Sequence, residues 1–336
     1  MNISIAMTTY NGARFLDQQL ASLATQSKQP FEVVVCDDSS TDSTVEILRA
    51  WAASVAFPVH IYQNEQKLGF KDNFWKAANL CSGDLIAFCD QDDVWLEDKL
   101  QGCAAEFAHS DVLLVMHSAK LVDSELRFLG KNHPPISKRR VAEPLDVNPW
   151  GLVPGFALVF SSKILRGADW EGRPEDHLGP GYPMGHDHWV YLMASVLGRI
   201  VFLPDCLALY RRHQTNTTGS VDRTVKKFVR QGIDTGEDGY KHLANLSLER
   251  SEYLNRLSER TDNTARSDYK NASLYYQKLS KSFTLRASIH SSRVGFLKKA
   301  SYILKLLLGR AYRDLDRGGL GPRAFVKDVF FSVARH

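Results

Sequence analysis

Short apolar segments alternate with amphipathic ones along the first 120 residues. The apolar segments have the length and β-branched content of strands, whereas the others repeat their apolar positions every three to four residues, as helices do. This alternation is typical of βαβ units, in which helices cover both faces of a mostly parallel sheet, so we predict an α/β fold with a Rossmann-like sheet. The predicted strands are Asn2–Thr8, Phe31–Cys36, Val59–Gln63, Asp84–Cys89 and Val112–His117, and the predicted helices are Ala13–Thr25, Ser43–Ala53, Lys71–Leu80 and Leu96–Ala108.

The pattern is less regular in the middle of the chain and helical towards its end. Lys131–Trp150 and Asp169–Gly185 are rich in turn-forming residues, so we predict surface loops there. We place a domain boundary between residues 219 and 220, because helical patterns dominate after it. The further predicted elements are strands Gly155–Phe160 and Ile200–Leu203 and helices His186–Leu197, Thr224–Arg230, Tyr240–Leu257, Asp268–Lys281 and Arg293–Leu308.

The charge changes sign at the same boundary. The 336 residues carry a net charge of +4, but residues 1–219 hold 19 Lys and Arg against 26 Asp and Glu, a balance of −7. Residues 220–336 hold 23 against 12, a balance of +11. A basic region of this kind needs an anionic partner. A membrane surface, nucleic acid and the acidic front half are the candidates. Trp51, Phe74, Trp75 and Trp95 of the front half are not interleaved with basic residues as in a nucleic-acid reader, so we expect no nucleic-acid partner.

Composition places the chain among ordinary globular proteins. No uncharged apolar run approaches the roughly 18 residues of a membrane span, and the first residues resemble a strand, not a signal peptide. The five cysteines include no Cys-x-x-Cys pair, so we expect reduced thiols and neither a disulfide framework nor a zinc knuckle. These features predict a cytoplasmic protein.

Three polar clusters follow predicted strands. They are residues 8–12 (TTYNG), 37–42 (DDSSTD) and 90–95 (DQDDVW). Parallel strands bring their carboxyl ends to one edge of a sheet, where such folds bind ligands. Carboxylates gathered there repel one another unless a cation neutralises them, and Asp90 and Asp92 offer the hard oxygen ligands that suit Mg²⁺ or Mn²⁺. The pattern therefore favours a metal–diphosphate site over a simple turn.

Taken together, the ordered motifs resemble the inverting glycosyltransferases of family 2, which have the A-type nucleotide-sugar fold. The resemblance covers roughly the first 219 residues, and within the family it is strongest to bacterial rhamnosyltransferase-like enzymes of surface-polysaccharide assembly. It implies a catalytic domain at 1–219 and a nucleoside-diphosphate sugar donor, either dTDP-rhamnose or a UDP-hexose. It also implies a glycan or lipid-linked glycan acceptor. The motifs are residues 8–12, 36–42, 64–73, 90–95 and 210–216.

The resemblance also implies a role for individual residues. Asp187 corresponds to the catalytic base of the family. Asp90, Asp92 and His213 correspond to positions that hold Mn²⁺ or Mg²⁺. Donor-binding positions are Thr8, Tyr10, Asn11, Asp37, Asp38, Gly69, Asn73, Asp90 and Gln91, and acceptor-binding positions are Trp95, Gly155, His186, His188 and Trp189.

The chemistry of sugar transfer supports those assignments. A sugar hydroxyl is a poor nucleophile, so a positioned carboxylate must accept its proton, and a divalent metal stabilises the leaving diphosphate. A single base facing the donor carbon gives one displacement and therefore inversion. Asp187 follows a Gly/Pro-rich loop at the start of a predicted helix, where an anion is favoured. A simple helix cap is the alternative reading of Asp187.

The sequence departs from the family pattern in three places. Ser39 stands where glycine is common, and Pro154 precedes Gly155 where a small polar residue is usual. His188 replaces an aromatic residue after the base, which changes the acceptor pocket or the basicity of Asp187.

A zinc site is the alternative for the histidines around the predicted base. His186-x-His188 offers two imidazoles, and His177 or His213 would complete the ligand set. No fixed ligand spacing accompanies them, so the sequence favours this reading less than the glycosyltransferase site.

Two other functional classes stay open. A nucleotidyltransferase or sugar-nucleotide pyrophosphorylase would use a similar sheet and metal site, but no Gly-rich phosphate loop follows the first strand. A non-catalytic glycan- or nucleotide-binding module would not need Asp92, Asp187 and His213 together. For the basic C-terminal region the sequence leaves membrane-surface contact at the inner face of a bacterial cytoplasmic membrane, packing on the catalytic domain, and a homodimer interface as alternatives.

Overall fold

The computed structural model describes residues 1–213, 236–261 and 265–333. It divides into two compact units, and each is described by itself. The first unit contains residues 1–143, 152–168 and 185–213. The second contains 144–151, 169–184 and, of the residues described after 213, 236–261 and 265–333. The predicted boundary at 219/220 and the predicted helix Thr224–Arg230 lie outside the described residues.

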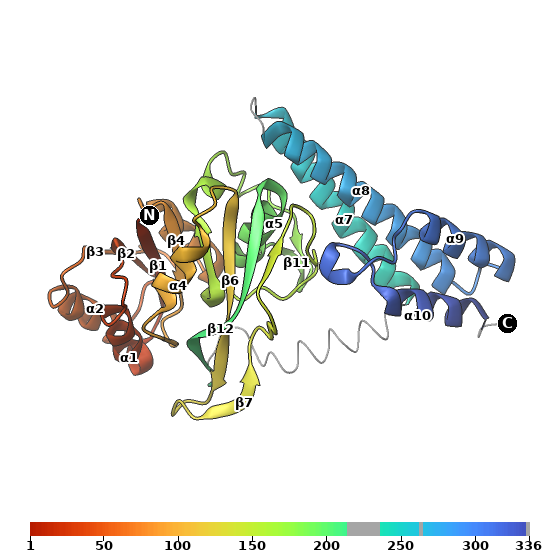
Figure 1. Ribbon diagram of the computed structural model, residues 1–336. Coiled ribbons are helices and arrows are strands. Elements are labelled where there is room, and N and C mark those ends of the chain that lie inside the picture. Colours follow the sequence, from red (N-terminus) through yellow and green to blue (C-terminus); the bar gives the residue numbers. More distant parts are fainter. Residues whose placement is uncertain (214–235, 262–264, 334–336) are drawn as a thin grey trace. The chain divides into compact units, whose positions relative to one another are not determined.

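A mixed sheet forms the centre of the first unit (Figure 1). Its strand order is β3-β2-β1-β4-β9-β6-β12-β5, with β7 paired to β6 and β8 paired to β12. β1 runs parallel to β2 and β4, and β2 runs parallel to β3, whereas β9 is antiparallel to both of its neighbours. The strands are β1 Ile3–Thr9, β2 Glu32–Asp37, β3 Val59–Gln63, β4 Leu85–Cys89, β5 Val94–Trp95, β6 Val112–Val122, β7 Phe128–Asn132, β8 Arg140–Ala142, β9 Leu158–Ser161 and β12 Arg199–Arg211.

The central strands are buried along their whole length. Every residue of β1, β2 and β4 is buried. These strands show no alternation of buried and exposed residues, because helices cover the sheet and neither of its sides faces solvent. The α/β architecture predicted from the sequence is therefore confirmed, with the A-type mostly parallel sheet at its centre. The helices of this unit are α1 Ala13–Ala24, α2 Thr44–Ala52, α3 Phe70–Leu80, α4 Lys99–Glu106 and α5 His186–Leu197, with 3₁₀ turns η1 Gly155–Ala157 and η2 Ser162–Leu165.

Several elements differ from the sequence prediction where tertiary pairing decides their ends. The predicted strand Ile200–Leu203 is the start of a 13-residue strand, because β12 continues along β6 through two register shifts. The helix predicted from Leu96 begins at Lys99, since Val94 and Trp95 pair with β12 as a strand.

The second unit is mainly helical. α7 (Glu237–Glu259) and α8 (Ala265–His290) lie side by side, and α9 (Phe296–Leu308) and α10 (Pro322–Val333) pack against α8 and each other (Figure 1). The unit also holds the 3₁₀ turn η3 (Leu315–Arg317) and a hairpin of β10 (Glu175–Asp176) and β11 (Gly179–Pro183). This hairpin lies in a segment predicted as loop, and α10 was not predicted.

Buried groups fix the C-terminal helices of this unit. Ile289, Ile303 and Leu306 form a small apolar cluster between α8 and α9. Asp328 of α10 is completely buried and accepts hydrogen bonds from Arg286 and His290 of α8. No helix among residues 1–213, 236–261 and 265–333 is long and apolar enough to cross a bilayer.

Candidate functional site

The polar clusters predicted from the sequence meet at one edge of the sheet. In the register of the parallel strands Thr9 lies opposite Asp37, and Met7 lies opposite Cys89, the residue before Asp90. β1, β2 and β4 therefore deliver their carboxyl ends to the same place. This arrangement follows from parallel pairing of neighbouring strands.

The buried Asp37 side chain links the carboxyl ends of β1 and β2. Its Oδ2 accepts a hydrogen bond from Thr9 Oγ1 at 2.7 Å and one from Ser40 Oγ at 2.5 Å, while its Oδ1 accepts one from the Ser40 backbone N–H at 2.9 Å. These contacts orient the turn after β2 and hold it against β1.

Asp38 closes the segment before α3. Its Oδ1 accepts from Leu68 N–H at 2.7 Å and from Asn64 Nδ2 at 2.9 Å, and its Oδ2 accepts from Gly69 N–H at 2.9 Å. Gly69 has φ of +81°, which is a conformation that glycine adopts without strain. Asp38 thus fixes the conformation of the segment before α3, a role that the sequence did not reveal.

Asn73 connects the segment before α3 to the sheet. Its Nδ2 donates to the Cys36 carbonyl at 2.8 Å, and its Oδ1 accepts from Asn64 Nδ2 at 2.8 Å. Asn64 also accepts from Lys76 Nζ at 2.8 Å. Asn64 was not among the predicted site residues, although it lies inside the motif at 64–73, because nothing in the motif marks a buried amide as a junction.

Tyr10 and Gln91 hold β1 and β4 together across the edge. Tyr10 N–H donates to Gln91 Oε1 at 2.8 Å, and Gln91 Nε2 donates to the Tyr10 carbonyl at 3.1 Å. A Cβ on Gly12 would lie only 2.2 Å from Gln91 Oε1, so a larger residue at position 12 would displace the Gln91 amide from these hydrogen bonds. The Tyr10 ring is exposed, and Lys67 Nζ lies 3.5 Å from its centroid. An exposed ring beside an ammonium group suits stacking of a planar base next to a phosphate.

Asn11 and Thr8 complete the first cluster. Asn11 has φ of +47° and accepts a hydrogen bond from Thr41 N–H on its Oδ1 at 2.8 Å. Thr8 is buried in β1, one residue before the strand end. The predicted donor-binding residues therefore share one edge, and their contact with a donor stays a prediction.

Asp90, Asp92 and Asp187 lie within electrostatic range of one another. Burial raises the pKa of Asp90 to about 7, and the negative charges of Asp92 and Asp187 add to the rise. Asp187 is 95 residues further along the chain than Asp92, so only the fold brings it within electrostatic reach of Asp90. Carboxylates at such short range favour a cation or a proton between them.

His213 joins the same group. Its Nε2 lies 2.7 Å from Asp92 Oδ2, and its ring packs against Phe15 with a centroid separation of 4.7 Å. Carboxylates and one imidazole fit the ligand preferences of Mn²⁺ and, less closely, of Mg²⁺. The raised pKa of Asp90 means that its negative charge is disfavoured, and a divalent cation beside it would stabilise that charge.

Two buried cations that the sequence did not single out brace this group. The guanidinium group of Arg211 donates to the Asp92 carbonyl at 2.7 Å and to the Ser124 carbonyl at 2.6 Å, and its backbone N–H donates to Asp93 Oδ1 at 2.9 Å. Arg211 stands in the predicted Tyr210–Asn216 motif, but its burial is a tertiary fact.

Lys99 is the second buried cation. Its Nζ donates to the Phe156 carbonyl at 2.7 Å and lies 3.5 Å from the Trp95 ring centroid. Burial lowers the pKa of Lys99 to about 8, while neighbouring groups that include Asp93 and Asp90 oppose the fall. Lys99 therefore connects the acidic loop to the turn that precedes β9.

Asp187 lies in the first turn of α5, whose N-cap is Gly185. Its Oδ1 accepts a hydrogen bond from the His188 backbone N–H at 2.8 Å. Gly155 approaches this turn so closely that a Cβ there would lie 2.9 Å from His186 Nε2 and 3.7 Å from Asp187 Cβ. Because Gly155 has no side chain, its backbone can lie this close to the first turn of α5.

The predicted acceptor residues are mostly buried. His186 stacks on Phe74 with ring centroids 4.1 Å apart, and burial lowers its pKa to about 4. Trp189 and Trp95 are also buried, with Trp189 edge-on to Trp75 at 5.2 Å. These rings pack inside the first unit, and their contact with an acceptor stays a prediction.

The predicted zinc ligands are distributed over both units. His186, His188 and His213 belong to the first unit, and His213 pairs with Asp92. His177 belongs to the second unit, beside the Asp176 carboxylate at 3.7 Å, so the zinc site stays a prediction.

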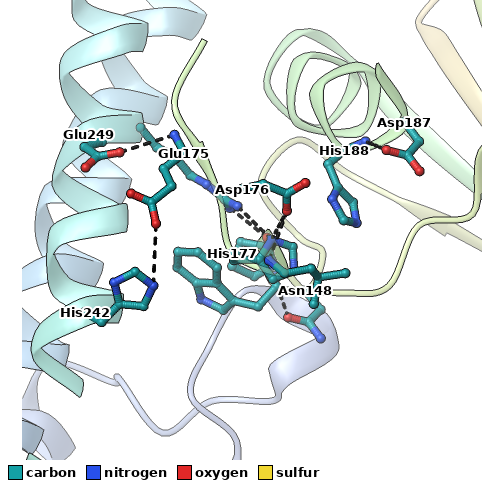
Figure 2. A network of polar contacts seen from close by, with 12 residues as sticks. Asn148, Glu175, Asp176, His177, Asp187, His188, His242 and Glu249 are labelled. Atoms are coloured by element: carbon teal, nitrogen blue, oxygen red, sulfur yellow. Dashed lines mark hydrogen bonds and ion pairs between the residues drawn. The ribbon is translucent and has the colours of Figure 1, made fainter. Parts of the chain in front are cut away.

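The second unit fastens its hairpin to α7 through polar contacts (Figure 2). The Glu175 backbone N–H donates to Glu249 Oε2 at 3.3 Å, and His242 Nε2 lies 3.9 Å from Glu175 Oε1. Arg250 Nη2 lies 3.3 Å from His177 Nδ1. These contacts make the hairpin part of the helical unit.

Comparison with known proteins places these motifs among relatives. Residues 4–166 match the Glycosyl transferase family 2 family. An uncharacterized glycosyltransferase from Nostoc sp. strain PCC 7120 is 28% identical over 225 residues, which are 64% of this chain and 66% of that protein. The dTDP-rhamnosyl transferase RfbG of Shigella flexneri is 34% identical over 99 residues, 28% of this chain and 34% of RfbG.

Similar solved structures share the fold over almost the whole chain. The crystal structure of S. aureus TarS residues 1–349 in complex with UDP-GlcNAc has a TM-score of 0.55 at 20% identity, and the match covers 99% of this chain and 89% of that one. By sequence, the chain spans 63–66% of the length of the first curated relatives.

Proposed function

Residues 4–166 match glycosyl transferase family 2, and from this premise we propose that the chain transfers a sugar from a nucleoside-diphosphate sugar to a hydroxyl group of a glycan or lipid-linked glycan. The similarity to RfbG, named a dTDP-rhamnosyl transferase, supports dTDP-rhamnose as a donor. A UDP-hexose is the other candidate. The proposed setting is assembly of a bacterial surface polysaccharide.

The donor would lie along the carboxyl edge of β1, β2 and β4. The exposed Tyr10 ring offers a stacking surface for the base, and Lys67 beside it offers a positive charge for phosphate. Asp38 and Asn73 fix the shape of the opposite wall through their bonds to Gly69 and to the Cys36 carbonyl. A pocket fixed in this way binds its donor without ordering loops at that moment.

Asp90, Asp92 and His213 would hold the Mn²⁺ or Mg²⁺ ion. The bound cation would supply Lewis-acid stabilisation of the leaving diphosphate. Arg211 would hold the acidic loop in place through its hydrogen bond to the Asp92 carbonyl, and Lys99 through its hydrogen bond to the Phe156 carbonyl. These buried donors cost no reorganisation when charge develops above them.

Asp187 would accept the proton of the acceptor hydroxyl. It lies in the first turn of α5, and the lack of a side chain at Gly155 lets the backbone there approach it closely. A single base on the acceptor side gives one in-line displacement, so we expect inversion at the donor carbon. The observation that carries the proposal is the convergence of Asp187 with Asp90 and Asp92, from distant parts of the chain.

The proposal is tested by screening donors against the purified full chain. Binding of the correct nucleotide sugar to the folded state raises the melting temperature, and Mn²⁺ should increase that rise. dTDP-rhamnose, UDP-glucose and UDP-GlcNAc are the first donors to compare. Release of a nucleoside diphosphate supports transfer or hydrolysis, whereas release of pyrophosphate would favour the nucleotidyltransferase alternative. Binding without any turnover would favour a non-catalytic module.

A further inference from the structure

Among the described residues, none covers an apolar stripe on the outer side of α9. The inner side of the helix packs into its unit through Lys299, Ile303 and Leu306, all buried. At 100° per residue, the exposed stripe is centred about a third of a turn away from these buried residues. Its members are Phe296, Leu297, Leu304, Leu307 and Leu308.

Three leucines of this stripe are more than half exposed. Leu297 is 83% exposed, Leu308 is 77% exposed and Leu304 is 55% exposed. Lys298 and Lys305 are seven residues apart and lie together beside the stripe, on the side away from the buried residues. An apolar face bordered by lysines is the pattern of a helix that lies in a membrane interface.

The neighbouring helix repeats the pattern. On α10, Val326 is 66% exposed and Phe330, one turn later, is 63% exposed. Asp328 holds the other side of α10 inside the unit, through Arg286 and the Tyr312 hydroxyl. The exposed apolar residues of α10 are therefore fixed outward and are not a fraying helix end.

The positive charge of the segment that contains α9 and α10 favours an anionic partner. Residues 281–336 contain 12 Lys and Arg against 3 Asp and Glu. One of those three acids, Asp328, is buried and bonded to Arg286. A second copy of the chain would bring like charges together, whereas anionic lipid complements both the lysines and the leucines.

We propose that the exposed face of α9 and α10 docks on the surface of an anionic phospholipid bilayer. α9 has 13 residues and is about 20 Å long, too short to cross a bilayer, so it would lie in the plane of the interface. The leucines would enter the acyl boundary, and Lys298 and Lys305 would contact lipid phosphates. This docking is independent of the proposed sugar transfer.

The test is co-sedimentation of the full chain with vesicles that contain 30% phosphatidylglycerol in phosphatidylcholine, compared with pure phosphatidylcholine. We expect binding to the anionic vesicles that weakens as salt is raised, because salt screens the lysine–phosphate attraction. Lys298→Glu with Lys305→Glu should weaken binding roughly thirty-fold or more, since each lysine near the surface contributes about a factor of five. Leu304→Glu with Leu308→Glu should weaken it at least as much.

Matched controls come from α7 and α8 of the same unit. Leu248 and Leu274 are exposed leucines, and Lys270 and Lys278 are exposed lysines outside the proposed face. Leu248→Glu with Leu274→Glu, and Lys270→Glu with Lys278→Glu, should change binding less than three-fold. Unchanged melting temperatures show that all variants fold.

Three outcomes would overturn the proposal. They are equal binding to neutral and anionic vesicles, unchanged binding of the α9 variants, and absence of vesicle binding combined with a dimer that Leu304→Glu dissociates. The last outcome would assign the face to a second copy of the chain. Because the assay contains no donor or acceptor, its failure leaves the proposed sugar transfer untouched.

Discussion

Asp90 in the sheet unit and Asp328 in the helical unit are aspartates in confined surroundings, and their pKa values move in opposite directions. Burial and the negative charges of Asp92 and Asp187 raise the pKa of Asp90 to about 7. Burial also acts to raise the pKa of Asp328, but hydrogen bonds from His290 and the charge of Arg286 outweigh it and hold that pKa below its ordinary value. Burial alone therefore does not distinguish the two sites.

The difference lies in what surrounds each carboxylate. Asp328 receives hydrogen bonds from Arg286, His290 and Tyr312, so its charge is satisfied within the protein. The negative charges of Asp92 and Asp187 act on Asp90, and the positive charge of the buried Lys99 opposes them only in part. A satisfied carboxylate stabilises a fold, whereas an unsatisfied group is poised to receive a cation or a ligand.

The largest expected effect separates the base from the fold. Asp187→Asn keeps the size of the side chain and removes its ability to accept a proton. We expect turnover to fall about 10²- to 10⁴-fold, with donor affinity and melting temperature little changed, because general-base catalysis contributes that much. Initial rates of nucleoside diphosphate release, together with a donor titration, measure both quantities.

Asp187→Glu is the matched control, since it retains a carboxylate on a longer side chain and should keep more activity than the Asn variant. Normal turnover by Asp187→Asn would reject the assignment of Asp187 as the base. Loss of donor binding in that variant would instead make Asp187 part of the donor site.

The second prediction concerns the satisfied carboxylate. Asp328→Ala leaves the buried Arg286 guanidinium without its bidentate partner, so we expect the helical unit to lose about 3–5 kcal/mol of unfolding free energy. Urea denaturation followed by far-UV circular dichroism measures it. Asp238→Ala, at an exposed position on α7, should change stability by about 0.5 kcal/mol or less. Equal losses in both variants would contradict the contrast between the two aspartates.

The smallest expected effect is a pH-dependent shift on metal binding. The ordinary Asp pKa is 3.8 and that of Asp90 in the folded protein is about 7, so the folded state holds an extra proton between these values. Stability from this group is therefore lost as pH rises from about 4 through about 7. A divalent cation competes with that proton, so Mn²⁺ should raise the melting temperature by roughly a few degrees at pH 8 and by less at pH 5.5.

Asp90→Asn and Asp92→Asn are the informative variants for this experiment. The Asp90 variant should melt at the same temperature or higher than the parent protein at pH 8 without metal, because a repelling charge is gone. The Asp92 variant should lose the Mn²⁺ shift. A shift of the same size at both pH values in the parent protein would show that the cation does not displace a proton at Asp90.

The local sequence pattern was sufficient to predict most helices and strands, and most of the residues at the carboxyl edge of β1, β2 and β4. The strands that end at Thr9, Asp37 and Cys89 are short apolar runs, and their following polar residues are visible in the sequence. Parallel pairing then requires these ends to meet. The sequence was less informative for Lys99 and Arg211, because long basic side chains are normally solvated and nothing local predicts their burial.

By itself the sequence determined which segments become strands and helices, where polar clusters follow strands, and that the chain reverses in charge. Those properties depend on neighbours within a few residues. Only the tertiary structure decided that Asp187 would meet Asp90, that Asp38 would close a loop, and that the leucines of α9 would face outward. Each of these depends on packing between elements that are far apart in the chain, and a repeating pattern specifies a face without specifying what covers it.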